Sequence, residues 1–254
     1  MQKVRVFIVV LALSIVSAQA QEFSLPEGLS DLGNLGSMLE AIQKPAESNE
    51  QYRFDLIVVS ETLNVAENTT SKLTQYFADE AFYVEIDQDN ATVLDFDNQS
   101  IIIIDKKENT QRVVTTEFFK QMTQLGQSFI PNQGSTVSVK RIFKQDEVKQ
   151  ILGFDAELWK MEGDSNTADA WVARAIDFDF VAFSQKLLSL FDSAGGSMVV
   201  DFSELDGELP PGLPLEVTTY EDGRKDSVTK MLSVDESGAT LDLSRYRKVS
   251  MLGL

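Results

Sequence analysis

From Gln51 onward, apolar residues recur at every second position, in short runs that polar turn residues separate. The first run places Tyr52, Phe54, Leu56 and Val58 at alternate positions. Because alternate residues of a β-strand point to the same face, this run predicts a strand that is apolar on one side. Similar runs joined by short polar segments predict an antiparallel meander. Its further strands are expected at residues 72–77, 81–86, 92–96, 100–105 and 111–115.

Two helices are expected to interrupt the strand series. Residues 116–129 and 176–193 place apolar side chains at three- and four-residue spacing, which predicts amphipathic helices. Thr116 is the expected N-cap of the first helix, and Ala194-Gly195-Gly196 is expected to end the second. Asp222-Gly223 predicts the turn of a hairpin. The remaining strands are expected at residues 136–143, 154–162, 168–174, 213–221, 225–234 and 245–251.

Strands and helices are grouped in this order and do not alternate, which is typical of α+β proteins. We therefore expect a single α+β domain over residues 51–254, with a large curved antiparallel sheet and helices packed on one face. No internal repeat or long linker divides this region. Residues 21–50 are expected to be a mobile lead-in that contains a short amphipathic helix.

The first twenty residues have the pattern of a secretory signal peptide. Lys3 and Arg5 are basic, residues 6–16 are almost entirely apolar, and Ala18-Gln19-Ala20 offers the small residues that precede cleavage. Cleavage is expected after Ala20, which predicts a periplasmic or secreted protein. The apolar run is too short to span a bilayer, and no transmembrane segment is expected in the mature chain.

The chain of 254 residues contains no cysteine and no histidine. These absences exclude disulfides, zinc fingers, thiolate nucleophiles and every Ser-His or Cys-His mechanism. The 40 acidic and 22 basic residues give a net charge of −18. Such a charge opposes binding to nucleic acid or to an anionic membrane, because both need clustered Lys and Arg. We expect no nucleic-acid partner and interpret the acidity as a property that keeps an exported protein soluble.

Acidic pairs recur, and the segment Asp87-Gln88-Asp89-Asn90 comes closest to a calcium loop. Such a loop needs oxygen ligands at regular offsets, a glycine at its sharp turn and a distal glutamate. Ala91 occupies the next ligand position, so we interpret the segment as a solvated turn and expect no metal. The sequence also contains no G-x-S-x-G, P-loop or G-x-G-x-x-G motif. We expect no cofactor and no catalytic residues, although a pair of carboxylates could support hydrolysis without histidine.

In the run Ile101-Ile102-Ile103-Ile104, the residues that would face either side of a strand are all apolar. This pattern predicts a strand that is covered on both faces. Two interpretations of the large apolar side chains stay open. They fill a solid core, or they line an apolar cavity for a lipid-like ligand under a curved sheet. The candidate lining residues are Phe82, Phe96, Ile102, Ile104, Trp159 and Trp171.

The segment Gly153-Phe154-Asp155-Ala156-Glu157-Leu158-Trp159, followed after a gap by Trp171-Val172-Ala173, resembles the core of the bacterial family called domain of unknown function 4412. Residues 94–105 resemble that family's strand–turn–strand, and residues 213–223 resemble its late hairpin. The resemblance runs from about residue 51 to residue 236. One position that is often Cys in the family is Ala156 here.

This family is similar to the periplasmic lipoprotein carriers and the outer-membrane lipoprotein receptors. The resemblance therefore implies an unclosed β-barrel with helices on its concave face, and acyl chains held between the two. It implies an envelope protein with a hydrophobic groove. It supplies no catalytic residues and no established activity.

Three functions are open to a chain of this kind. The first is a non-enzymatic periplasmic or secreted protein whose hydrophobic groove binds a lipid-like or other apolar ligand. The alternative is an envelope protein with a filled core that recognises another protein through an exposed strand edge or the lead-in segment. The third is a carboxylate-based hydrolase, which requires an Asp/Glu pair in a cleft with one raised pKa.

Overall fold

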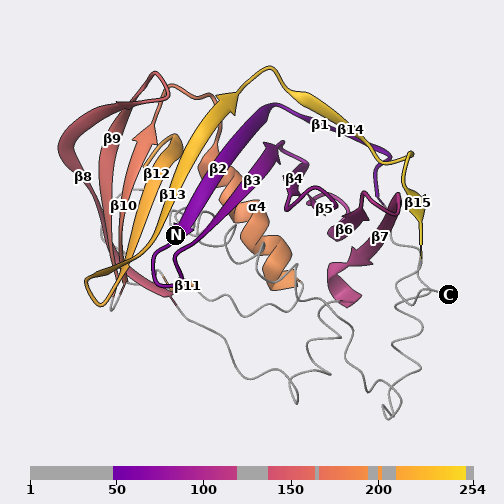
Figure 1. Ribbon diagram of the computed structural model, residues 1–254, viewed down its shortest axis with the longest axis horizontal. Helices are drawn as coiled ribbons and strands as arrows, with labels where there is room; N and C mark the ends of the chain where they lie inside the picture. Colours follow the sequence, from indigo (N-terminus) through magenta and orange to yellow (C-terminus); the bar gives the residue numbers. More distant parts are fainter. Residues whose placement is uncertain (1–47, 119–136, 164–165, 194–199, 202–209, 250–254) are drawn as a thin grey trace, which may run out of the picture.

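The computed structural model describes residues 48–118, 137–163, 166–193, 200–201 and 210–249 (Figure 1). The expected signal peptide, nearly all of the lead-in segment and most of the first expected helix lie outside these residues. Within them, thirteen strands form one sheet and two further strands pair separately. The large sheet is open, because its first and last strands do not pair with each other.

A meander of six strands forms one half of this sheet. Each strand pairs antiparallel with the next along the chain, as the alternating apolar pattern predicts. Asn68, Gln99 and Asn109 have positive φ in three of the turns. The six strands are β2 (Leu56–Asn64), β3 (Thr69–Phe77), β4 (Ala81–Glu85), β5 (Asn90–Asp95), β6 (Ser100–Asp105) and β7 (Thr110–Thr115).

Three strands form most of the other half, and they too pair antiparallel in chain order. They are β8 (Val137–Ile151), β9 (Phe154–Gly163) and β10 (Asn166–Ala173). The expected strand at 136–143 is only the first half of β8, because the second half is rich in charged residues and lacks a regular apolar alternation. The short strand β11 (Val200–Asp201) pairs parallel with the beginning of β8.

A late hairpin joins the two halves. It consists of β12 (Leu213–Glu221), which pairs with β10, and β13 (Arg224–Asp235), which pairs with β2. Asp222 and Gly223 both have positive φ at its turn, so the predicted hairpin is confirmed. The complete order of the sheet is β11-β8-β9-β10-β12-β13-β2-β3-β4-β5-β6-β7-β15, where β15 is Arg247–Lys248.

The first expected strand, residues 52–58, is in fact two strands. β1 (Gln51–Phe54) leaves the large sheet and pairs with β14 (Ala239–Asp242), whereas β2 stays in the sheet. Asp55 lies at the break, and its backbone N–H donates to the carbonyl of Phe77 at 3.0 Å. The alternation continues through the break because the alternate residues of both strands are buried.

Two apolar clusters lie on opposite faces of the strands β4 and β5. The first cluster contains Phe82 and Leu94, and it extends along the sheet to Trp159. The second contains their strand neighbours Tyr83 and Val93 together with side chains from β1, β6 and the segment around β14. Adjacent residues of a strand point to opposite faces, which explains why neighbours fall in different clusters.

One complete helix, α4 (Phe180–Ser193), packs against the first cluster. Asp179 caps it, because its carboxylate accepts the backbone N–H of Ala182 at 2.9 Å. This cap places the start of the helix four residues after the expected Ile176. The ring of Phe183 lies 5.0 Å from that of Phe77.

The expected α+β class, with helices covering a concave face, is wrong. Most of the described residues are in strands, and α4 is the one complete helix among them. Residues 116–118 begin a second helix, and its cap is Thr115, whose hydroxyl accepts the N–H of Phe118 at 3.2 Å, and not the expected Thr116. The sequence pattern underestimated the strand content because it missed charged or very short strands such as the second half of β8, β11 and β14. The described part of the protein is therefore a mostly β structure, without a layer of helices on a concave face.

Candidate functional site

The structure distributes the six candidate lining residues over two faces of the sheet. Phe82, Phe96 and Trp159 belong to the first apolar cluster, and Trp171 packs against it. Ile102 and Ile104 belong to the second cluster, on the opposite face. The six side chains therefore do not line one common surface. Contact of any of them with a ligand stays a prediction.

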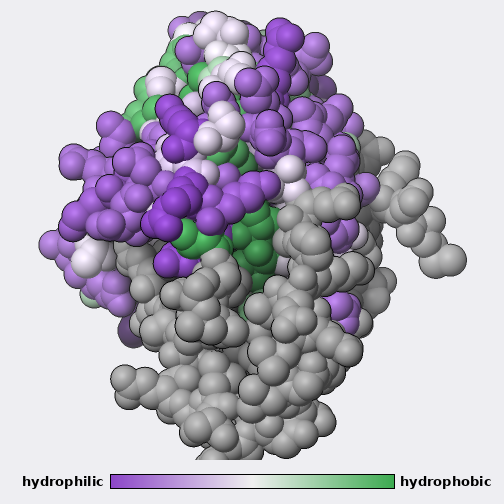
Figure 2. Space-filling view, turned by 90° about the vertical axis from the view of Figure 1, so that its right-hand side faces the viewer, coloured by the Kyte–Doolittle hydropathy of each residue, from purple (hydrophilic) through white to green (hydrophobic). Residues whose placement is uncertain are grey.

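The strand of four isoleucines is fully buried on one face and partly covered on the other, so its predicted covering on both faces holds only in part. Ile101 packs against the first cluster, whereas Ile102 and Ile104 are fully buried in the second. The second cluster is closed by β1 and by Leu241, Leu243 and Tyr246 from the C-terminal segment. Figure 2 shows the side of the molecule on which β7 and β15 lie, where polar residues cover most of the described surface around a narrow apolar band.

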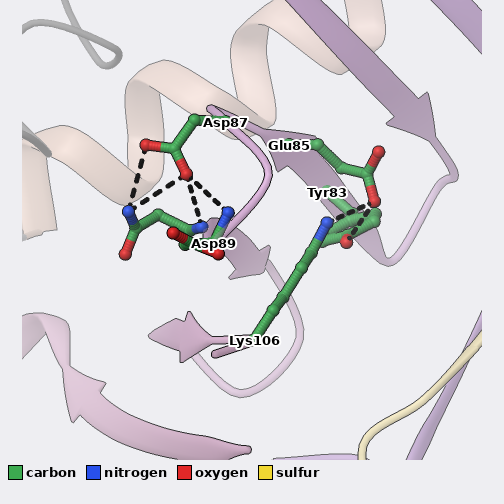
Figure 3. A network of polar contacts seen from close by, with 6 residues as sticks. Tyr83, Glu85, Asp87, Asp89 and Lys106 are labelled. Atoms are coloured by element: carbon green, nitrogen blue, oxygen red, sulfur yellow. Dashed lines mark hydrogen bonds and ion pairs between the residues drawn. The ribbon is translucent and has the colours of Figure 1, made fainter. Parts of the chain in front are cut away.

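Figure 3 shows how the acidic turn after β4 uses its carboxylates. The Asp87 carboxylate accepts the backbone N–H groups of Asp89 and Asn90 at 2.8 and 2.7 Å, and also the Asn90 side-chain amide. These hydrogen bonds, led by that of the Asn90 side chain, lower the pKa of Asp87. The carboxylate therefore closes the turn. No group of three or more acidic side chains in the described ranges is arranged to hold a metal ion.

A second polar group lies beside this turn. Glu85 accepts hydrogen bonds from the Tyr83 hydroxyl at 2.8 Å and from the Lys106 ammonium at 2.7 Å (Figure 3). Burial, followed by the charge of Glu85, raises the pKa of Tyr83. These contacts join β4 to the turn after β6, so their evident role is to hold neighbouring strands together.

The carboxyl groups with shifted pKa values favour the ionised form. The pKa is lowered for Asp87, Glu157, Asp235 and Asp242, mainly through hydrogen bonds that each carboxylate accepts. A general acid for glycoside hydrolysis needs a raised pKa instead. These four groups therefore do not fit that role.

The long hairpin of β8 and β9 presents a different feature, an unpaired strand edge. On its inner side β8 pairs with β9 from Val139 to Ile151. On its outer side β11 pairs with Val137 and Ser138 alone. Among the described residues, the outer backbone edge of β8 therefore has no partner strand from residue 139 to residue 151. β8 lies at the left-hand margin of the sheet in Figure 1.

Exposed apolar side chains lie at the tip of the same hairpin. Val148 is 62% exposed and Leu152 is 43% exposed. Leu152 and Gly153 form the turn, with φ of 53° and 86°. The other non-glycine residues with positive φ in the described ranges are asparagine, glutamine or aspartate, so Leu152 stands apart. A bulky apolar residue is unfavourable in this left-handed conformation. The stability of the turn therefore does not explain why leucine occupies this position.

Ion pairs cross the sheet next to this edge. Glu157 accepts from Lys144 on β8 and from Arg174 after β10, both at 2.8 Å, and the Lys144 hydrogen bond is the main cause of its lowered pKa. The Lys149 ammonium lies 3.0 Å from the Glu216 carboxylate and 4.2 Å from the centre of the Trp171 ring. Trp171, one of the six candidate residues, is therefore partly covered by a lysine of β8. These contacts link the neighbouring strands β8, β9, β10 and β12 and stabilise this part of the sheet.

An exposed strand edge is expected from the sequence only in general terms, and the sequence does not indicate that it lies on β8. The missed half of β8 has no apolar alternation, which is the signal that identifies a half-buried strand. A weak signal was present in Gly153, because an isolated glycine in a strand pattern marks a break such as a bulge or a turn. That turn extends the preceding strand to Ile151.

In the described part of the chain, no helix has the length and apolar character needed to cross a membrane. No protein-family model matches the chain. No curated protein matches it either.

Solved structures show distant similarity. PNGF-II in two crystal forms is 14% and 12% identical, with TM-scores of 0.31 and 0.33, and the alignments cover 79% and 80% of this chain. MucB in complex with MucA(peri) is 10% identical, with a TM-score of 0.33 and 84% of this chain covered. This chain spans 32% of the PNGF-II chain and 59% of the MucB chain. Similarity at this level carries no argument about function.

Proposed function

We propose that the protein is an exported, non-enzymatic binding module that recognises another protein through the outer edge of β8. The observation that carries the proposal is the run of backbone from residue 139 to residue 151, which lacks a partner strand within the described ranges. An extended segment of another protein can add to such an edge through main-chain hydrogen bonds. The signal-peptide pattern supports an envelope or extracellular location.

The character of β8 favours selective binding over indiscriminate pairing. Long open edges aggregate unless charged side chains or bulges restrict which strands can pair with them. β8 carries six charged residues, and its register with β9 shifts between Lys144 and Val148. A partner strand must therefore match both the charges and the shape of this edge.

The exposed apolar side chains at the tip of the hairpin also favour binding at the β8 edge. Val148 lies on β8 itself, and Leu152 lies directly after it, so apolar contact area is available beside the open edge. Main-chain pairing contributes affinity without sequence preference, whereas side-chain contacts beside it select the partner. The edge and the tip together form one continuous binding surface.

A photo-crosslinking experiment tests the proposal. A benzophenone side chain would replace Val148 in the mature protein, and a matched control would carry it in place of Ser71, an exposed residue of β3. In cells that export the protein, the Val148 variant should give one adduct of defined mass, and the Ser71 variant should not. Absence of any adduct at Val148, or the same adducts from both positions, would contradict the proposal.

Native mass spectrometry of the purified mature chain separates this proposal from lipid binding. The proposal expects a chain without bound lipid. A stoichiometric lipid would instead support the apolar groove implied by the family resemblance and would overturn a filled-core binding module.

A further inference from the structure

The pairing between β8 and β9 is interrupted twice, and the interruptions divide β8 into two regular stretches. Lys140 is an extra residue between the pairs that Val139 and Arg141 form with β9. A larger bulge follows at residues 145–147, which lie opposite Leu158 of β9 alone. Bulges bend a strand and leave their extra residues unpaired. A regular partner strand therefore cannot follow the outer edge of β8 across this bulge in one register.

The turn at Leu152-Gly153 determines which backbone groups of the second stretch, next to the tip, face outward. Both turn residues have positive φ, as in a type I′ turn. In such a hairpin the residues that flank the turn exchange main-chain hydrogen bonds, and the exchange repeats at every second pair. Ile151 and Lys149 therefore bond to β9. The N–H and C=O groups of Val148 and Gln150 point away from β9, toward the open edge.

The side chains of this second stretch leave no free charge at the edge. Val148 and Gln150 are exposed, and Leu152 adds exposed apolar area at the tip. Lys149 is the one charged residue of the stretch, and its ammonium lies 3.0 Å from the Glu216 carboxylate. A strand that adds here therefore meets outward backbone groups beside apolar side chains.

The first regular stretch, residues 141–144, offers no comparable surface. Ile142 is buried in the first cluster, whereas Arg141 and Lys144 are charged and exposed. The guanidinium of Arg141 lies 4.4 Å from the centre of the Phe143 ring and covers it. Charged side chains and bulges at an edge discourage pairing. The stretch at residues 148–151 is therefore the part of the edge that is suited to receive a strand.

Acidic side chains surround the second stretch. Asp146 and Glu147 precede Val148 in the bulge, and Asp155 lies opposite Gln150 on β9. All three acidic residues are exposed, and the whole chain has a formal charge of −18. Like charges that meet in an interface cost free energy and reject wrong partners. These carboxylates therefore select against an acidic segment at this edge.

We propose that residues 148–151 receive a short extended segment of another protein, apolar and free of acidic residues, and that the bulge ends the pairing. This inference rests on the proposed function, because it names the class of partner that binds the same edge. Val148 and Gln150 supply the main-chain hydrogen bonds, and the side chains of Val148 and Leu152 supply the apolar contact.

Photo-crosslinking from the tip tests the inference in cells that export the protein. A benzophenone side chain in place of Leu152 keeps this position apolar and captures the partner. It is combined with Gln150→Pro, which removes the outward N–H, or with Gln150→Ala, which keeps it. Neither change removes a bond to β9, so both variants should stay folded. The adduct yield of Gln150→Pro should be at least about tenfold lower than that of Gln150→Ala.

A second pair of variants tests the apolar contact with the same reporter. Val148→Asp brings a negative charge to the edge, whereas Val148→Thr keeps the branched shape without a charge. Val148→Asp should lower the adduct yield roughly tenfold or more, and Val148→Thr should lower it by about threefold at most. Equal yields from these two variants would contradict an apolar partner.

A third measurement locates the pairing along β8. A benzophenone in place of Arg141, in the first stretch, should give no adduct with the protein that the Leu152 reporter captures. The same adduct from Arg141 would overturn the inference, as would an adduct with a second copy of this chain. Either the Val148 pair or the Arg141 reporter decides the matter if circular dichroism shows that Gln150→Pro is unfolded.

The outcomes separate this inference from the proposed function. Equal adduct yields from folded Gln150→Pro and Gln150→Ala would overturn pairing at residues 148–151. An adduct at Val148 would then still support protein recognition at the β8 edge. The absence of any adduct at both Val148 and Leu152 would remove the inference and the proposed function together.

Discussion

At the scale of single residues, Asp95 is a fully buried side chain whose carboxyl group accepts three hydrogen bonds. Its oxygens accept the Tyr52 hydroxyl at 2.5 Å, the Asn98 backbone N–H at 2.9 Å and the Asn98 side-chain amide at 2.7 Å. Tyr52 belongs to β1, so this group fixes β1 against the end of β5. Burial, and next the hydrogen bond to Asp95, raise the pKa of Tyr52.

Replacing Asp95 by Asn should destabilise the protein more than replacing Tyr52 by Phe. The Asn side chain turns one acceptor into a donor that faces other donors, and a buried polar group without a partner costs about 1–3 kcal/mol. Tyr52→Phe removes one hydrogen bond, and its cost should be about 1 kcal/mol. Urea unfolding of both variants and of the double variant measures the difference. Equal or reversed effects would show that the Asp95 contacts do not stabilise β1.

The pKa of Asp87 should depend on Asn90. The Asn90 side chain is the main cause that lowers this pKa below its ordinary value of 3.8, so Asn90→Ala should raise it toward that value. A lowered pKa stabilises the fold above the ordinary value, and this contribution is lost as the pH falls through the lowered value. The effect on stability should stay below about 0.5 kcal/mol, because Asp87 is exposed and water screens it. Carbon NMR of the carboxyl group measures the titration, and an unchanged midpoint in the variant would contradict the assignment.

Burial of single residues could be predicted from the sequence, but the surface that they share could not. All six candidate lining residues are buried or partly buried. Alternation shows which residues of one strand share a face, and it does not show which face of the next strand joins them. For this reason Phe82 and Ile102 were grouped together although they lie on opposite faces.

At the scale of elements, the turn of the β8–β9 hairpin places Leu152 where asparagine is preferred. Leu152→Asn should raise the free energy of unfolding by roughly 0.5–1 kcal/mol, because a left-handed conformation strains a branched apolar side chain more than asparagine. Thermal or urea unfolding measures this gain. A loss of stability would show that Leu152 makes contacts that hold the hairpin, which would count against its role in binding.

Two glycines with positive φ should respond differently to alanine. A Cβ on Gly212 would lie 2.2 Å from the carbonyl oxygen of Ala173, whereas a Cβ on Gly153 would meet nothing within 4 Å. Gly153→Ala therefore carries the conformational cost alone, about 1–2 kcal/mol. Gly212→Ala must also separate β12 from the end of β10, and we expect it to be the more destabilising change by at least about 2 kcal/mol. Similar unfolding midpoints for the two variants would contradict this close approach.

Most strands could be predicted because local signals specify them. The hairpin at Asp222-Gly223 and the six-strand meander follow from turn residues and alternation. The pairing partner of a strand is harder to predict from the sequence. For example, β1 and β14 are distant in sequence, and no local pattern indicates that they pair. The strand content was underestimated because short strands such as β11 and β14 have too few residues to show a period.

At the scale of the whole molecule, the chain order and the sheet order differ at one decisive place. The hairpin of β12 and β13 lies between β10 and β2, so it joins a half built from residues 56–115 to a half built from residues 137–173. The first apolar cluster also extends across this junction, from Phe82 and Leu94 to Trp159. Both features couple the two halves, which should unfold as one unit.

The positions of the tryptophans make this coupling measurable. The chain has two tryptophans, Trp159 on β9 and Trp171 on β10, so both lie in the same half of the sheet. Ile104→Ala on β6, in the other half, leaves a cavity in the second cluster and should cost about 2–5 kcal/mol. If the halves are coupled, the urea midpoint measured by tryptophan fluorescence should fall as far as the midpoint measured by circular dichroism. Val148→Ala, at an exposed position, should move neither midpoint appreciably. A fluorescence midpoint that Ile104→Ala leaves unchanged would show that the β8–β10 half unfolds separately. The late hairpin would then connect the two halves without coupling their unfolding.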